Sequence, residues 1–98
     1  MAQPFLPHSD GNGHAVVIGE KTAVTKVAAL GTGAVVLVAW SNGPGYIQLG
    51  GETADATVHD QSIYLPVDAG MVTLRRGPDH SHIAWDGIDL HAVMGDGL

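Results

Sequence analysis

The sequence contains no cysteine, few charged residues and no long apolar segment. A chain without cysteine forms neither disulfides nor thiolate metal sites. The longest apolar run, residues 34–40, is far too short to cross a bilayer as a helix. Pro4, Pro7 and Asp10 interrupt the N-terminus where a signal peptide needs a continuous apolar stretch. We therefore expect a protein that is soluble and intracellular when it is made.

Positive charge is also scarce, and this argues against two classes of partner. Ten acidic residues against four basic ones give a formal net charge of −6. Nucleic acids and anionic membranes both require a basic surface, so we expect neither as a partner. Charged residues make up 14% of the chain, against about 25% in average proteins. Such a weakly charged surface favours a small domain that is packed against other proteins.

Short apolar runs separated by glycine-rich turns are the main feature that is present. They occupy residues 14–18, 33–40, 46–49, 63–65, 70–74, 82–85 and 88–94, and a further strand is predicted over 22–27. This spacing is typical of a small β-sandwich or β-barrel, so we predict an all-β fold of about seven to eight short, mostly antiparallel strands. Ninety-eight residues suffice for one domain, which we place at residues 14–98.

Residues 1–13 precede that domain and have a different composition. They contain two prolines and end in a Gly-Asn-Gly breaker, so we expect an extended N-terminal arm without regular hydrogen bonding. The arm is either a frayed tail or a segment that lies over a neighbouring subunit. In the second case Phe5 and Leu6 would be its apolar anchors.

The run at residues 34–40 is apolar on both of its alternating sides. Val36, Val38 and Trp40 share one side, and Val35, Leu37 and Ala39 share the other. Such a strand is either central, with cover on each face, or partly buried in a contact between subunits.

Arg75 and Arg76 form the only concentrated positive charge, and as neighbours in a strand they point to opposite faces. They are either solvated at a strand end, or one of them meets an acidic partner. The candidate assembly contacts are Phe5, Leu6, Val36, Val38, Trp40 and Arg75.

The Asp86-Gly87 pair between two apolar runs predicts a type I′ hairpin. The predicted register pairs Trp85 with Ile88, and it continues outward along both strands. One face of this hairpin is then apolar and belongs to the core; it consists of Ile83, Trp85, Ile88 and Leu90. The other face carries His82, Ala84, Asp89 and His91.

On that second face, His80, His82, His91 and Asp89 are ordinary ligand types for zinc and other transition metals. They are equally the polar residues expected on the solvent side of a hairpin. We favour the solvent side, because the sequence supplies no pocket and no fourth ligand at a recognisable spacing. Trp40 and Tyr46 flank one turn and are either a sugar-stacking pair or residues at the edge of the core. No catalytic set can be argued, so we expect neither an enzyme nor a cofactor.

The segment from about residue 38 to residue 98 resembles the small head decoration, or cement, proteins of tailed bacteriophages. The similarity lies in the strand before Ser41-Asn42-Gly43, the strand that closes on Leu49-Gly50-Gly51, the Leu65 to Gly70 turn region and the Gly-Asp-Gly-Leu ending. This resemblance implies a non-enzymatic virion protein on the outer capsid surface, made in the host cytoplasm. Its implied partners are the major capsid protein and two further copies of itself, as a trimer at three-fold positions that clamps adjacent capsomers.

Two other functions remain open at this point. One is a sugar-binding or host-adhesion β-module of the virion, and the other is a small cupin-like metalloprotein.

Overall fold

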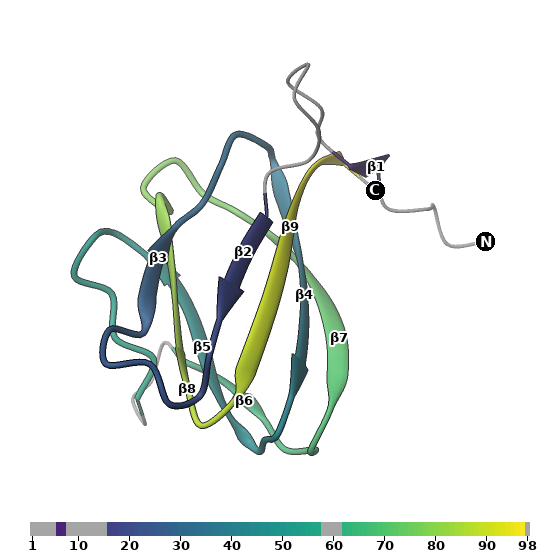
Figure 1. Ribbon diagram of the computed structural model, residues 1–98. Coiled ribbons are helices and arrows are strands. Elements are labelled where there is room, and N and C mark those ends of the chain that lie inside the picture. Colours follow the sequence, from purple (N-terminus) through teal and green to yellow (C-terminus); the bar gives the residue numbers. More distant parts are fainter. Residues whose placement is uncertain (1–5, 8–15, 58–61, 98) are drawn as a thin grey trace.

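The computed structural model describes residues 6–7, 16–57 and 62–97. They form nine β-strands and no helix, and the strands make two sheets that pack face to face (Figure 1). Every strand pairing in these residues is antiparallel. The predicted all-β fold is therefore confirmed.

The first sheet, sheet A, has the order β1-β9-β4-β7, and β2 also pairs with β9. Its strands are β1 (Leu6–Pro7), β2 (Val16–Gly19), β4 (Val35–Ser41), β7 (Gly70–Arg75) and β9 (Asp89–Gly97). Strand β4 lies between β9 and β7, so the run at residues 34–40, which is apolar on both sides, belongs to a central strand. Strands β1 and β2 share the opposite side of β9, at its C-terminal and N-terminal halves respectively.

The second sheet, sheet B, has the order β3-β8-β5-β6. Its strands are β3 (Val27–Ala29), β5 (Gly45–Gly50), β6 (Ile63–Leu65) and β8 (His82–Asp86). Most connections between successive described strands cross from one sheet to the other; β5 and β6 are consecutive strands that pair with each other. Strands that are neighbours in the sequence are thus rarely neighbours in a sheet.

The core fills the space between the two sheets. Val17, Val36, Val38, Leu90, Ala92 and Met94 enter it from sheet A, while Ile47, Leu65, Ile83 and Trp85 enter it from sheet B. Trp85 is 4% exposed, and its indole Nε1 donates a hydrogen bond to the Glu20 carbonyl oxygen at 3.1 Å. A large aromatic side chain is thus buried with its one polar atom satisfied.

The predicted hairpin at Asp86-Gly87 is wrong, although its predicted core residues are buried. Strand β8 pairs with β3 and β5 in sheet B, whereas β9 pairs with β2 and β4 in sheet A. A type I′ turn needs positive φ at both central residues, but Asp86 is extended in β8 and only Gly87 has positive φ, at 81°. The segment therefore crosses between the sheets, and Ile88 is fully buried where it does so.

Two further expectations for strands need correction. Within 22–27 only Val27 lies in a strand, because residues 20–26 carry the chain from sheet A to sheet B. The expected lack of regular hydrogen bonding in residues 1–13 is wrong for Leu6–Pro7, which pair with Gly97 and Gly95 of β9. The rest of the arm, residues 1–5 and 8–13, lies outside the described residues.

Candidate functional site

The outer face of sheet A carries apolar side chains from four adjacent strands. The cross-strand register arranges them in two rows. The first row is Ile18, His91, Ala39 and Met71; the second row is Val16, Val93, Leu37 and Thr73. The alternate residues of the same strands point into the core, so both rows face away from it. Ile18 is 78% exposed, Met71 66% and Val16 47%.

Charged residues lie beyond both ends of these rows. At one end Asp89 pairs with Ser41, and the exposed Glu20 directly follows β2. At the other end the exposed Arg75 pairs with Val35. We call the two rows, with these charged ends, the sheet A face. Lys21 also lies at the first end, where it contacts Asp89 and Asn42. With two carboxylates and one ammonium group that end is net negative, whereas the other end carries the Arg75 guanidinium.

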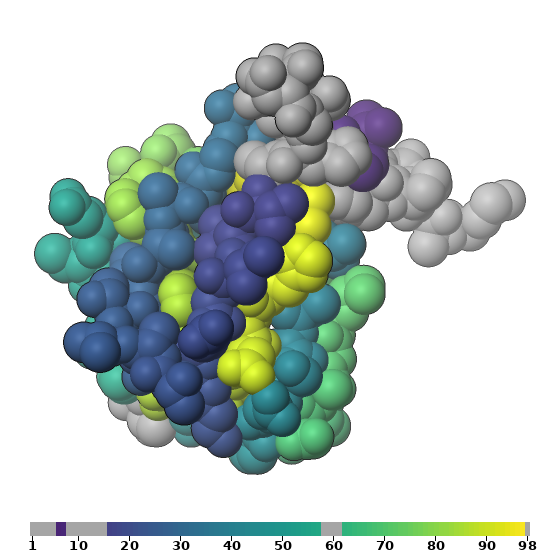
Figure 2. Space-filling view, viewed as in Figure 1, coloured from purple at the N-terminus to yellow at the C-terminus, as the bar shows by residue number. Residues whose placement is uncertain are grey.

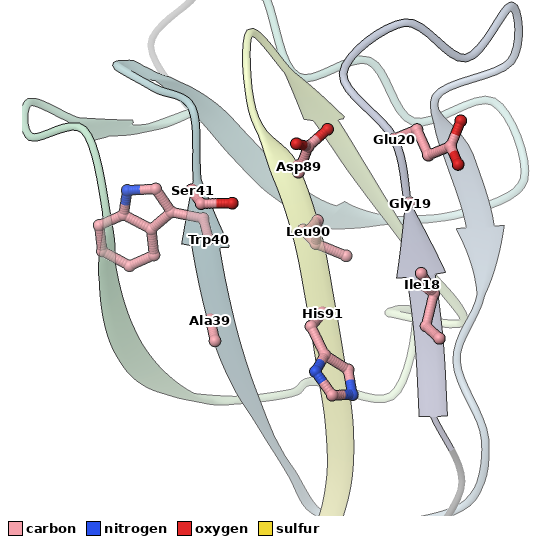
Figure 3. Close-up of a pocket in the computed structure, with 9 residues that line it drawn as sticks. All are labelled: Ile18, Gly19, Glu20, Ala39, Trp40, Ser41, Asp89, Leu90 and His91. Carbon is pink, nitrogen blue, oxygen red and sulfur yellow. The ribbon is translucent and has the colours of Figure 1, made fainter.

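A shallow hollow of about 430 Å³ lies at the negative end of the sheet A face (Figure 3). Figure 3 shows Ile18 on β2, His91 on β9 and Ala39 on β4 beside one another, with Asp89, Ser41 and Glu20 toward the strand ends. The small Ala39 side chain leaves room between its taller neighbours. The hollow is therefore a depression in a sheet surface and not an enclosed cavity.

Hydrogen bonds fix the negative end of the face. The Lys21 backbone amide donates to Asp89 Oδ1 at 2.7 Å, the Asn42 side-chain amide donates to Asp89 Oδ2, and Lys21 Nζ donates to the Asn42 carbonyl oxygen at 3.0 Å. These two hydrogen bonds to the carboxylate, with a smaller effect of the Lys21 charge, lower the pKa of Asp89 from its usual value. Asp89 thus joins the start of β9 to the loops that follow β2 and β4.

The structure separates the predicted assembly contacts into two groups. Val36 and Val38 are fully buried inside one chain, so their interpretation as contact residues is corrected: their side chains belong to the core.

Trp40 is half-buried at the edge of the core and donates from Nε1 to the Val67 carbonyl oxygen at 3.3 Å. Its indole extends toward β7 and away from Ile18 in Figure 3. The opposite side of β4, with Leu37 and Ala39, is the side that is presented outward.

The other candidates lie at the surface or outside the described part. Leu6 is 59% exposed on β1, and Arg75 is exposed at the end of β7. Arg76, in contrast, is half-buried and donates to the Gly31 carbonyl oxygen. Phe5 falls outside the described residues. The two arginines were expected to be neighbours in a strand that point to opposite faces, but β7 ends at Arg75 and Arg76 follows it.

The histidines and Asp89 do not form a cluster. His82 belongs to β8 in sheet B and His91 to β9 in sheet A, so the two side chains lie on different outer faces. His80 Nδ1 accepts a hydrogen bond from the Gly77 amide at 2.9 Å, within its own turn. Within the described ranges, no three metal-ligating side chains come together. The prediction that these side chains share one face was therefore wrong, because β8 and β9 do not form a hairpin.

Trp40 and Tyr46 do not form one aromatic surface either. Trp40 is in sheet A, whereas Tyr46 is in sheet B and packs against Tyr64 across the strand pair. The two tyrosine rings have centroids 5.1 Å apart and are tilted by 41°. The half-buried Tyr46 is therefore paired with the exposed Tyr64 and not with Trp40.

The chain was compared with protein families, curated proteins and solved structures. None of them matches it. In the part of the chain that the structure describes, no helix is long and apolar enough to span a membrane. A functional assignment therefore depends on the surface itself.

Sequence reasoning missed Ile18 and Met71, the most exposed members of the two rows. The sequence signal for them is the run 16–18, which, like the run 34–40, is apolar on both of its alternating sides. Strands that are apolar on both sides and lie in the same sheet give that sheet an apolar outer face. Which strands are adjacent is fixed only by the topology.

Proposed function

We propose that this protein is a capsid decoration protein: a non-enzymatic virion component that binds the outer capsid surface and stabilises contacts between capsomers. The observation that carries the proposal is the sheet A face, where Val16, Ile18 and Met71 are exposed on the flanking strands β2 and β7. The apolar side chains of β9 and β4 between them, Val93, Leu37 and Ala39, are half-buried. Exposed apolar patches of this kind mark protein contacts on small soluble domains. The low charge content and the resemblance of residues 38–98 to decoration proteins support the same function.

The architecture suits a passive clamp. Ile18, Val16 and Met71 lie on paired antiparallel strands, so little backbone freedom is lost when a partner covers them. Covering an exposed apolar side chain of this size contributes up to about 1.5–3 kcal/mol. Three copies around a three-fold position, as the resemblance implies, would multiply modest single contacts through avidity. In this proposal the major capsid protein is the partner of the sheet A face.

The test is a binding assay with capsids of the phage that encodes the chain, assembled without it. Wild-type protein should co-sediment with the capsids and raise their melting temperature. Ile18→Lys should abolish both effects, because it replaces the most exposed apolar side chain of the rows with a charged one. Val24→Lys is the matched control, since Val24 is fully exposed in the loop after β2 and lies off the sheet A face. Wild-type protein that does not bind capsids would refute the proposal.

The Tyr46–Tyr64 pair favours a second candidate function, a sugar-binding or host-adhesion module. Tyr64 is 53% exposed, and Asp86 is paired with Tyr46 on the same outer face of sheet B. An exposed ring beside a carboxylate can stack on a sugar and accept its hydroxyl hydrogen bonds. A glycan array with wild-type and Tyr64→Ala protein tests this. Binding of a glycan by the wild type that Tyr64→Ala loses would favour adhesion, and no binding would remove this candidate.

A further inference from the structure

The arrangement of charge on the sheet A face identifies one partner that it fits. Figure 2 shows β2, β9, β4 and β7 lying side by side at the molecular surface. Along these strands the two apolar rows lie between Asp89, Glu20 and the exposed Asp68 at one end and Arg75 at the other. Asp68 is fixed at the negative end, because its carbonyl oxygen accepts a hydrogen bond from the Gly43 amide at 2.9 Å. The surface that complements this pattern is the same surface turned end to end.

We propose that the sheet A face pairs with the sheet A face of a second copy of this chain. The two-fold axis lies between the sheets, perpendicular to the strands, and passes between the two apolar rows. It sets the first row of each copy on the second row of the other. Arg75 of each copy then lies over the end of the other copy that holds Asp68 and Asp89. This contact is isologous, so both copies use the same residues.

Side-chain size supports this orientation. With the axis perpendicular to the strands, the small Ala39 faces Leu37 of the second copy, and His91 faces Val93. The small Ala39 thus meets the larger Leu37 at the centre, so the two faces can interdigitate there as in aligned β-sandwiches. An axis parallel to the strands would instead set the acidic ends on one another. Like charges would then meet across the contact, so that orientation is disfavoured.

The area sets the strength of the pairing. Strands about 4.8 Å apart and a rise of about 3.4 Å per residue give the face a footprint roughly 19 Å wide and 15 Å long. Two such faces bury on the order of 1,000 Å² of accessible surface in total, at the low end of specific protein interfaces. We therefore expect a reversible dimer with a dissociation constant in the micromolar range.

Pairing in solution would cover the face that the proposed function gives to the capsid. The inference stands on the charge and register of sheet A and not on that function. It replaces the trimer as our expectation for the isolated protein, whereas the three-fold arrangement remains a proposal for the capsid-bound protein. Capsid binding and dimerisation then compete for the same side chains.

Analytical ultracentrifugation of the full chain tests the pairing over a range of micromolar concentrations. The wild type should change reversibly from the mass of one chain to twice that mass. Ile18→Lys should raise the dissociation constant at least about tenfold, as expected for a charge moved into an apolar contact. Val24→Lys should leave it unchanged. Circular dichroism should show all variants folded.

A charge exchange separates this orientation from any other apolar contact. Arg75→Glu should weaken the dimer about three- to tenfold at low salt, and Arg75→Glu combined with Asp68→Lys should restore it. A monomer at every concentration, a trimer, or an Arg75→Glu dimer as tight as the wild type would overturn the inference. A protein that binds capsids but does not dimerise would refute the pairing and leave the proposed function intact. A protein that dimerises but does not bind capsids would support the pairing and refute the proposed function.

Discussion

Adding one methyl group at Gly19 should destabilise the fold, because Trp85 leaves no room for it. A Cβ atom at Gly19 would lie 2.3 Å from Cζ2 of Trp85 and 2.5 Å from Cε2. Carbon atoms pack at about 3.5–4.0 Å, so the ring would have to move by more than 1 Å. It is held in place by its burial, at 4% exposure, and by the hydrogen bond from Nε1 to the Glu20 carbonyl oxygen.

The expected cost follows from this geometry. Overpacking a core costs about 1–3 kcal/mol, and we expect the upper part of that range because Trp85 cannot relax without breaking its hydrogen bond. A loss of about 3 kcal/mol corresponds to a decrease in Tm of roughly 12–24 °C in a domain of this size. Gly51→Ala is the matched control, since a Cβ atom there meets nothing within 4 Å. It should be neutral or stabilise by up to about 1 kcal/mol.

Urea and thermal unfolding, followed by circular dichroism and tryptophan fluorescence, measure both variants. The double variant Gly19→Ala with Trp85→Leu should show a favourable coupling of about 1–2 kcal/mol, because the smaller side chain makes room for the methyl group. A Gly19→Ala protein as stable as Gly51→Ala would refute the placement of Trp85 against β2. It would also contradict the position of β2 beside β9, which places Ile18 on the sheet A face.

Three further predictions concern the crossing, the histidines and Asp89. Gly87→Val should lose about 1–3 kcal/mol in urea unfolding, because Gly87 has φ of 81° and its Cβ atom would lie 2.9 Å from the Pro44 carbonyl oxygen. His82→Ala and His91→Ala should each change stability by about 0.5 kcal/mol or less, and thermal melts of dilute protein should be the same with and without a chelator; a chelator-sensitive melt would reveal a metal site. Asp89 has a lowered pKa in the folded state, so its contribution to stability is present above the usual value of 3.8 and is lost as the pH falls below it. The difference in Tm between wild type and Asp89→Asn should therefore decrease on acidification, and a difference independent of pH would contradict this role.

The sequence predicted which residues are buried near the C-terminus but not how their strands pair. Ile83, Trp85, Ile88 and Leu90 are core residues in the structure, as they would be in a hairpin. A hairpin and a crossing between two sheets bury the same alternating side chains, so hydrophobic periodicity cannot distinguish them. Only the long-range pairing of β8 with β5 and of β9 with β4 decides between them.

The candidate site was limited by a similar ambiguity. The run 34–40 was correctly predicted to be apolar on both sides, but the sequence does not state which side meets the second sheet. Val36 and Val38 took the inner side, and Leu37 and Ala39 the outer one. The proposed contact surface is thus the side of β4 that the prediction did not choose. Its most exposed members, Ile18 and Met71, come from strands whose adjacency to β4 and β9 depends on the topology.

The most direct test of capsid decoration is electron cryomicroscopy of particles assembled with wild-type protein, with Ile18→Lys protein and without either. The wild-type particles should show a small two-sheet domain on the outer surface at three-fold positions, with the strands that carry Ile18 and Met71 against the capsomers. The Ile18→Lys particles should match the bare capsid. Wild-type particles without added density, or with sheet A facing solvent, would contradict the account.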